Sequence, residues 1–69
     1  MITRYVLILN HPDGRREPYV HDADDEVFGV SSRITVAGRC WHVSRPHAIR
    51  RGRRTRVAVN TYDCEPCPE

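Results

Sequence analysis

The sequence predicts a small all-β protein: a five-stranded antiparallel barrel or half-barrel with one short helical turn. Three observations lead to this fold class. The chain has 69 residues, the size of one domain with a small core. Its apolar residues fall in short runs that mostly alternate with polar ones, as in β-strands. Residues that favour turns separate most of these runs, which is typical of small barrels.

The first two runs predict a hairpin. Arg4–Asn10 is almost continuously apolar, which indicates a strand covered on both faces. The sequence His-Pro-Asp-Gly at 11–14 then predicts a tight turn, because Pro presets its backbone angle and Gly tolerates its last position. Arg15–His21 is the expected return strand, and Pro18 places it at an edge of the sheet.

An acidic stretch, Asp22–Glu26, follows the first hairpin. It predicts the single helical turn, with Asp22 as the N-cap and the carboxylates in the first turn, where the helix dipole favours them. Gly29 would end this turn. We expect Val27 and Phe28 to fill part of the core.

The best-defined element is a second hairpin over Arg33–Val43. Apolar and polar residues alternate on both sides of Ala-Gly at 37–38, which predicts a two-residue turn. With that turn, Ile34 lies opposite Trp41, and we expect Trp41 to anchor the core. Cys40 and His42 then leave the other face of the strand.

The last strands follow from weaker signals. The second strand of the hairpin is expected to reach Ser44 or Arg45, where Pro46 interrupts it, and to resume past a bulge at 47–49. A Gly-centred turn leads to the last strand, Thr55–Tyr62. Residues 1–62 are therefore the predicted barrel domain, and residues 63–69, with two prolines and no periodicity, the predicted tail.

The segment 34–43 reads Ile-Thr-Val-Ala-Gly-Arg-Cys-Trp-His-Val. It resembles a hairpin of the form I-x-V-x-G-x-x-W-x-V that occurs in many SH3-like small β-barrels. The resemblance covers ten of the 69 residues. It implies an SH3-like fold and no particular activity.

The chain has 11 basic residues, all arginine, against nine acidic ones. Either a genome rich in G and C or selection for the arginine fork at phosphates explains this choice. Five arginines fall within seven positions around Gly52, and their patch suits an acidic partner, nucleic acid or protein. A solvated turn is the alternative, and so is pairing with Asp22–Glu26, within the molecule or in a homodimer. The candidate binding residues are Arg45, Arg50, Arg51, Arg53, Arg54 and Arg56.

Three cysteines are an odd number, so we do not expect a disulfide framework. The C-x-x-C spacing of Cys64 and Cys67 is that of a zinc knuckle, and two further ligands on the hairpin would complete a tetrahedral site. A disordered tail is the alternative. The candidate ligands of a structural zinc are Cys40, His42, Cys64 and Cys67.

No residue set in the sequence suggests catalysis, and a chain of this size has little room for an enclosed active site. No apolar run is long enough for a signal peptide or a membrane helix, so we expect the cytoplasm and no membrane contact. The sequence therefore predicts a non-enzymatic interaction module that binds an acidic partner through its arginine loop. The alternative is a zinc-stapled structural domain or an accessory subunit of a larger complex.

Overall fold

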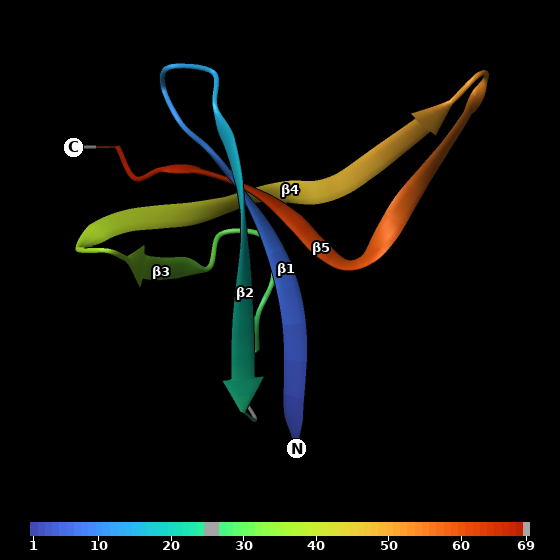
Figure 1. Cartoon of the computed structure of the whole chain (residues 1–69). Helices are drawn as coiled ribbons and strands as arrows, with labels where there is room; N and C mark the ends of the chain where they lie inside the picture. The colour runs from blue at the N-terminus through green and yellow to red at the C-terminus, as the bar shows by residue number, and fades with distance from the viewer. Residues whose placement is uncertain (25–26, 69) are drawn as a thin grey trace.

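A computed structural model describes residues 1–24 and 27–68, which form one five-stranded sheet (Figure 1). The strands are β1 (Ile2–Asn10), β2 (Arg16–Asp24), β3 (Arg33–Val36), β4 (Arg39–Arg51) and β5 (Arg54–Pro66). Their order across the sheet is β2-β1-β5-β4-β3. The sheet curls into a half-barrel with β2 and β3 at its two edges, so the all-β prediction with five strands is confirmed.

The sheet is mixed, and the prediction of a purely antiparallel sheet was wrong. β1 runs parallel to β5, with Leu7 opposite Tyr62 and Leu9 opposite Cys64. The other three pairings are antiparallel. The first hairpin occupies one side of β1, and β5 returns along its other side in the same direction. β1 is therefore a central strand with a hydrogen-bonded neighbour on each side. The expected coverage of both its faces was wrong: Leu7 and Leu9 are buried, whereas Val6, on the opposite face, is 36% exposed.

The predicted helical turn is absent from the described residues, although part of its range, residues 25–26, lies outside them. Asp22 belongs to β2, where it lies opposite Arg4 and accepts a hydrogen bond from its Nε at 3.0 Å. This hydrogen bond and the charge of Arg4 lower the pKa of Asp22. A cross-strand ion pair thus takes the place of the expected N-cap.

The segment after the acidic stretch reaches the core through one side chain only. Phe28 is half-buried and packs against Tyr5, with ring centroids 4.7 Å apart. Val27 is fully exposed, so its expected place in the core was wrong. The chain then turns at 29–32, where the backbone N–H of Ser32 donates to the carbonyl of Gly29 at 3.0 Å.

The core lies on the concave face of the half-barrel. Its fully buried side chains include Leu7, Leu9, Trp41, Val43 and Cys64. The prediction for Trp41 is confirmed, since only 2% of it is exposed. Ile34 lies opposite Trp41 as expected, and the two turn residues both have positive φ angles.

Residues 63–66 continue β5 instead of beginning a tail, so the predicted boundary was wrong at this point. Pro66 lies opposite Trp41, and the backbone N–H of Cys67 donates to the carbonyl of Cys40 at 3.1 Å. Pairing with both β1 and β4 satisfies the backbone here, which the polar, proline-containing sequence does not reveal.

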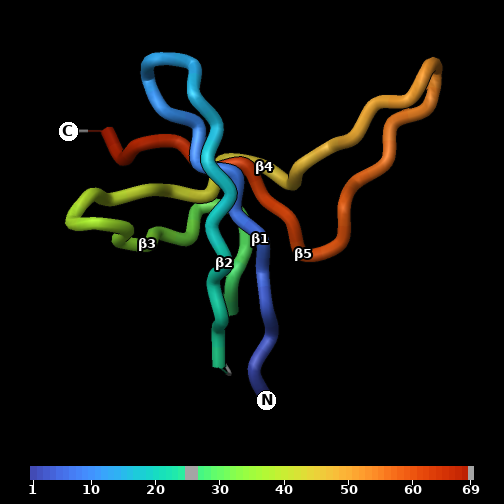
Figure 2. Tube along the Cα trace, in the orientation of Figure 1, coloured from blue at the N-terminus to red at the C-terminus, as the bar shows by residue number. Residues whose placement is uncertain are grey.

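β4 and β5 project beyond the body of the sheet as a two-stranded arm (Figures 1 and 2). We use "arm" for residues 48–57. Pro46 lies opposite Tyr62, and the next pair towards the arm is Ala48 opposite Val57. Between these two pairs β4 has one residue, whereas β5 has four, residues 58–61. Asn60, within that stretch, has a positive φ of 51°. This irregularity bends β5 and turns the arm away from the body. β4 itself runs through Pro46, so the expected interruption there was wrong, and its own extra residue is Ser44, before Pro46.

Candidate binding site: the arginine arm and its base

The arm is a short, regular antiparallel ladder. Arg51 lies opposite Arg54 next to the turn, and the pairing continues to Ala48 opposite Val57. Opposed residues share a face and successive residues alternate between faces. One face therefore carries Ile49, Arg51, Arg54 and Arg56. The other carries Ala48, Arg50, Thr55 and Val57.

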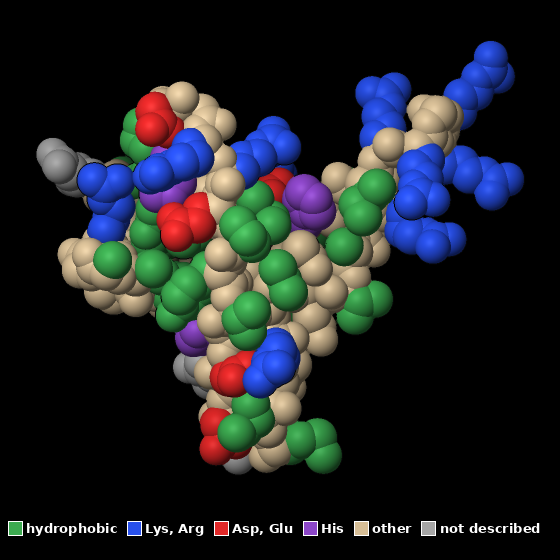
Figure 3. Space-filling model, viewed as in Figure 1, with side chains coloured by type: hydrophobic (Ala, Val, Ile, Leu, Met, Phe, Trp, Pro, Cys, Tyr) green, Lys and Arg blue, Asp and Glu red, His purple; other side chains and the backbone are tan. Residues whose placement is uncertain are grey.

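The first of these faces is an arginine surface. Ile49, Arg51, Arg54 and Arg56 line a shallow hollow of about 350 Å³. Arginine side chains crowd around the end of the arm and splay outward from it (Figure 3). Arg53, in the turn, adds a fifth exposed guanidinium to those of Arg50, Arg51, Arg54 and Arg56. These five arginines lie together at the end of the arm, where the sequence predicts a positive patch.

No carboxylate in residues 1–24 or 27–68 pairs with the five arginines of the arm. Two members of the acidic stretch are used locally: Asp22 pairs with Arg4, and Asp24 pairs with the N-terminal amine at 3.3 Å. The other acidic residues of the stretch, Asp25 and Glu26, lie outside the described residues. The positive charge of the arm is therefore not balanced by any described neighbour.

The sixth predicted binding residue, Arg45, lies apart from the arm. Its Nε donates to Oδ2 of Asp63 at 3.1 Å. His47 occupies the other carboxylate oxygen, with its Nδ1 2.9 Å from Oδ1. Asp63 is only 8% exposed, so this is a nearly buried carboxylate held by two basic side chains.

A β-bulge at Ser44 creates this arrangement. Val43 lies opposite Cys64, but the next pair joins Arg45 to Asp63, so β4 has one extra residue between the pairs. The hydroxyl of Ser44 donates to the backbone carbonyl of Asp63 at 3.0 Å. Because of the extra residue, Arg45 reaches the face on which Asp63 lies. His47, two residues further, shares that face.

Sequence reasoning missed the group formed by Arg45, His47 and Asp63. Its basic members stand at alternate positions of one strand, which was a usable signal. Asp63 falls in the predicted tail, so no expected strand pairing places it beside them. Only the pairing of β4 with β5 brings the three together.

The four predicted zinc ligands do not converge. Cys40 and Cys67 form a disulfide, with their Cα atoms 5.4 Å apart, whereas the sequence led us to expect no disulfide and to place both among the zinc ligands. Cys64 lies opposite Val43 on the face of the sheet that forms the core, and its thiol is free. His42 lies opposite Glu65. In the described ranges no group of three or more His, Cys, Asp or Glu residues could hold a metal ion.

Burial determines the chemistry of the remaining thiol. Removal from water raises the pKa of Cys64 to about 11, and the charges of Asp63 and Glu65 act in the same direction. The thiolate is the nucleophilic form of cysteine. Cys64 is therefore a protonated core residue at neutral pH.

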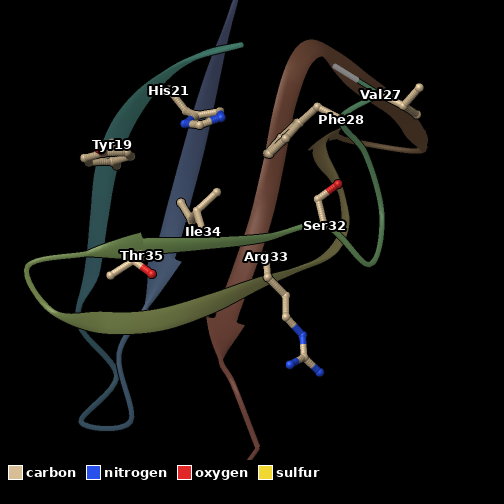
Figure 4. Close-up of a pocket in the computed structure, with 8 residues that line it drawn as sticks. All are labelled: Tyr19, His21, Val27, Phe28, Ser32, Arg33, Ile34 and Thr35. Atoms are coloured by element: carbon tan, nitrogen blue, oxygen red, sulfur yellow. The ribbon is translucent and has the colours of Figure 1, made fainter. Parts of the chain in front are cut away.

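A second hollow, of about 430 Å³, opens between the edge strands β2 and β3 (Figure 4). Tyr19 and His21 come from β2 and Ile34 from β3, while Phe28 reaches in from the connection between these strands. The His21 and Phe28 rings lie 4.9 Å apart. The side chain of Arg33 points away from this space. Three rings, those of Tyr19, His21 and Phe28, thus line this hollow beside aliphatic and hydroxyl side chains.

Comparisons with known protein families, with curated proteins and with solved structures gave no match to this chain. No helix capable of crossing a bilayer is present in the part of the chain that the structure describes. The fold and the arm define a small mixed β half-barrel that presents a cationic two-stranded ribbon.

Proposed function

We propose that this protein is a non-enzymatic nucleic-acid-binding module that contacts the phosphate backbone through its arginine arm. One observation carries the proposal: five exposed arginines stand on a projecting ribbon with no described carboxylate beside them. Arginine suits phosphate because its planar guanidinium donates two parallel hydrogen bonds.

The shape of the arm supports nucleic acid over other acidic partners. The major groove of B-form DNA admits a two-stranded β-ribbon. The arm is such a ribbon, and it stands clear of the half-barrel (Figure 1). Contacts of arginine with phosphate give affinity with little dependence on sequence. We therefore expect binding that is strongly dependent on salt and only weakly selective among sequences.

An acidic protein surface is the second candidate, and the other face of the arm favours it. Val57 and the nearby Val59 are 59% and 85% exposed. Apolar side chains beside arginines are common at protein interfaces. A homodimer in which the arm meets the acidic stretch of a second copy belongs to this candidate.

Fluorescence anisotropy with a labelled duplex, at several salt concentrations, tests the main proposal. The double variant Arg51→Ala/Arg54→Ala removes a cross-strand pair from the arginine face. The matched control, Arg33→Ala/Arg39→Ala, removes the same charge from another hairpin. We expect the arm variant alone to bind more weakly, with a slope of log K against log salt that is less steep by about two. If the two double variants weaken binding equally, net charge alone explains the binding and the proposed role of the arm is refuted.

The likeness to SH3-like barrels is supported by the five curled strands and the Trp41 hairpin, whereas the parallel pair β1 and β5 departs from it. The cytoplasmic location stays a proposal, and the disulfide between Cys40 and Cys67 counts against it, because cytosolic proteins keep most cysteines as thiols. A structural zinc is no part of the proposal, because two of its four ligands are bonded to each other.

A further inference from the structure

We propose that the base of the arm holds a phosphate-binding site formed by Arg16, Arg45 and His47, with Asp63 as its positioning residue. A hollow of about 210 Å³ lies there, lined by Asn10, Arg16, Arg45, Pro46, His47, Ala48 and Asp63. The ligand class is a tetrahedral oxyanion. The existence of this site does not depend on the proposed function. The assignment of its oxyanion to the backbone of a nucleic acid rests on that function.

Asp63 fixes both basic side chains of β4. Each of its carboxylate oxygens accepts one hydrogen bond, at 2.9 Å from His47 and at 3.1 Å from Arg45. A carboxylate only accepts, so the proton of the imidazole must lie on Nδ1. The ring then presents Nε2 on its opposite side, and no other described residue bonds to it.

The remaining polar groups of the hollow are cationic or already satisfied. Arg16 is exposed and forms no ion pair with a described carboxylate. The amide nitrogen of Asn10 donates to the carbonyl of Cys64 at 3.2 Å. The negative charge of Asp63 is matched by Arg45 beside it. The hollow therefore has a net positive charge through Arg16 even when the imidazole is neutral.

An oxyanion at Nε2 needs a donor there. With the Nδ1 proton held by Asp63, Nε2 donates only when the imidazole is doubly protonated. The charged groups that face the ring are Arg16 on β2, Arg45 on β4 and Asp63 on β5, with the neutral Asn10 on β1. Binding of an oxyanion should therefore take up a proton, so affinity should rise as pH falls.

The position of the hollow connects it to the arm. His47 is the single β4 residue opposite the four-residue stretch at which the arm bends away. Arg50 and Arg51, towards the end of the arm, follow on the same strand. A backbone that lies along the arm would thus meet one of its phosphates at the bend.

The direct test follows the imidazole resonances of the whole protein by NMR during titration with inorganic sulfate. Sulfate is a tetrahedral dianion whose charge does not change near neutral pH. We expect a saturable shift of the His47 Nε2 signal, with tighter binding at about pH 6 than at about pH 8. His47→Gln should weaken sulfate binding about tenfold. The matched control His42→Gln, on the same strand outside the hollow, should not.

Absence of a saturable shift, or equal binding by His47→Gln and wild type, would overturn the site. Asp63→Asn is the second variant: it keeps the shape but removes the charge that holds Nδ1. We expect it to reduce the difference in affinity between the two pH values. Circular dichroism checks that each variant keeps its strands. A pH dependence that persists in folded His47→Gln would also refute the role of the imidazole.

Duplex binding distinguishes the source of the oxyanion. If it is a backbone phosphate, His47→Gln lowers the salt slope by about one, in addition to the effect of the arm. An unchanged slope beside normal sulfate binding would support the site but assign it to a free phosphate. If the duplex does not bind at all, the proposed function fails, and the sulfate titration still decides the site.

Discussion

Cys40, in β4, forms a disulfide with Cys67, which lies 27 residues further along the chain. The bond fixes the end of β5 beside the start of β4, next to the position where Pro66 lies opposite Trp41. A chain of 69 residues buries a small core. A covalent link at this point therefore restrains the largest buried side chain of the fold.

We expect reduction of this disulfide to lower the free energy of unfolding by about 2–4 kcal/mol, because the open chain gains freedom mainly in the unfolded state. Urea denaturation with and without a reductant measures the change. Cys67→Ser should show the same loss and no further response to reductant. Wild-type stability that does not change on reduction would show that the disulfide does not stabilise the fold.

The buried thiol should be inert in the folded protein. Burial raises the pKa of Cys64 to about 11, so the reactive thiolate is scarce at neutral pH. We expect alkylation of Cys64 by iodoacetamide to be slow in the native state and fast in urea, as measured by mass spectrometry. Fast labelling of the oxidised, folded protein would contradict this burial.

The same raised pKa has a consequence for stability at alkaline pH. Folding favours the protonated thiol, so its contribution is complete below the ordinary thiol pKa of 9.0 and is lost as pH rises toward about 11. Cys64→Ser should remove this dependence. Unfolding curves at several alkaline pH values, compared between wild type and variant, check the sign.

The turn of the Trp41 hairpin offers a stabilising substitution. Ala37 has a φ of 50°, a left-handed conformation that is unfavourable for alanine, and Gly38 follows at 78°. Asn-Gly is the preferred pair for such a turn. Ala37→Asn should therefore raise stability by about 0.5–1 kcal/mol.

The control for this substitution is Gly38→Ala, which should lower stability. A Cβ at position 38 would meet no atom within 4 Å, so its cost would come from the backbone alone. Thermal unfolding followed by circular dichroism measures both changes. Stability lowered by Ala37→Asn would refute the left-handed turn.

The arm should be separable from the fold. Its arginines are exposed, and the buried core cluster lies in the body of the sheet. We expect the combined variant with alanine at positions 50, 51, 53 and 54 to unfold within about 0.5 kcal/mol of wild type. Chemical denaturation measures this, and a large loss would mean that the arm supports the core. Loss of binding by this variant could then not be assigned to the arm alone.

Hairpin register was the most predictable part of this fold. Val36 opposite Arg39 and Ile34 opposite Trp41 follow from alternation around a two-residue turn, and the structure has both pairs. The turn at 11–14 and the edge position of Pro18 were predictable for the same reason, because local backbone preferences decide them. The arginine patch was also visible in the sequence. The bend that turns the arm away from the body could not be predicted from the local sequence pattern.

The sequence by itself determined the strands and turns that depend on neighbouring residues, together with the density of arginine at 50–56. Only the tertiary structure decided the parallel pairing of β1 with β5, and with it the fate of residues 63–67. Those residues carry no periodicity, and residues 63–66 belong to β5 because β1 and β4 supply their backbone partners. The pairing of β5 with β4 places Asp63 beside Arg45 and His47, and it brings Cys67 to Cys40. Contacts between residues far apart in the chain leave no trace in local sequence, so the group at the base of the arm could be found only in the folded chain.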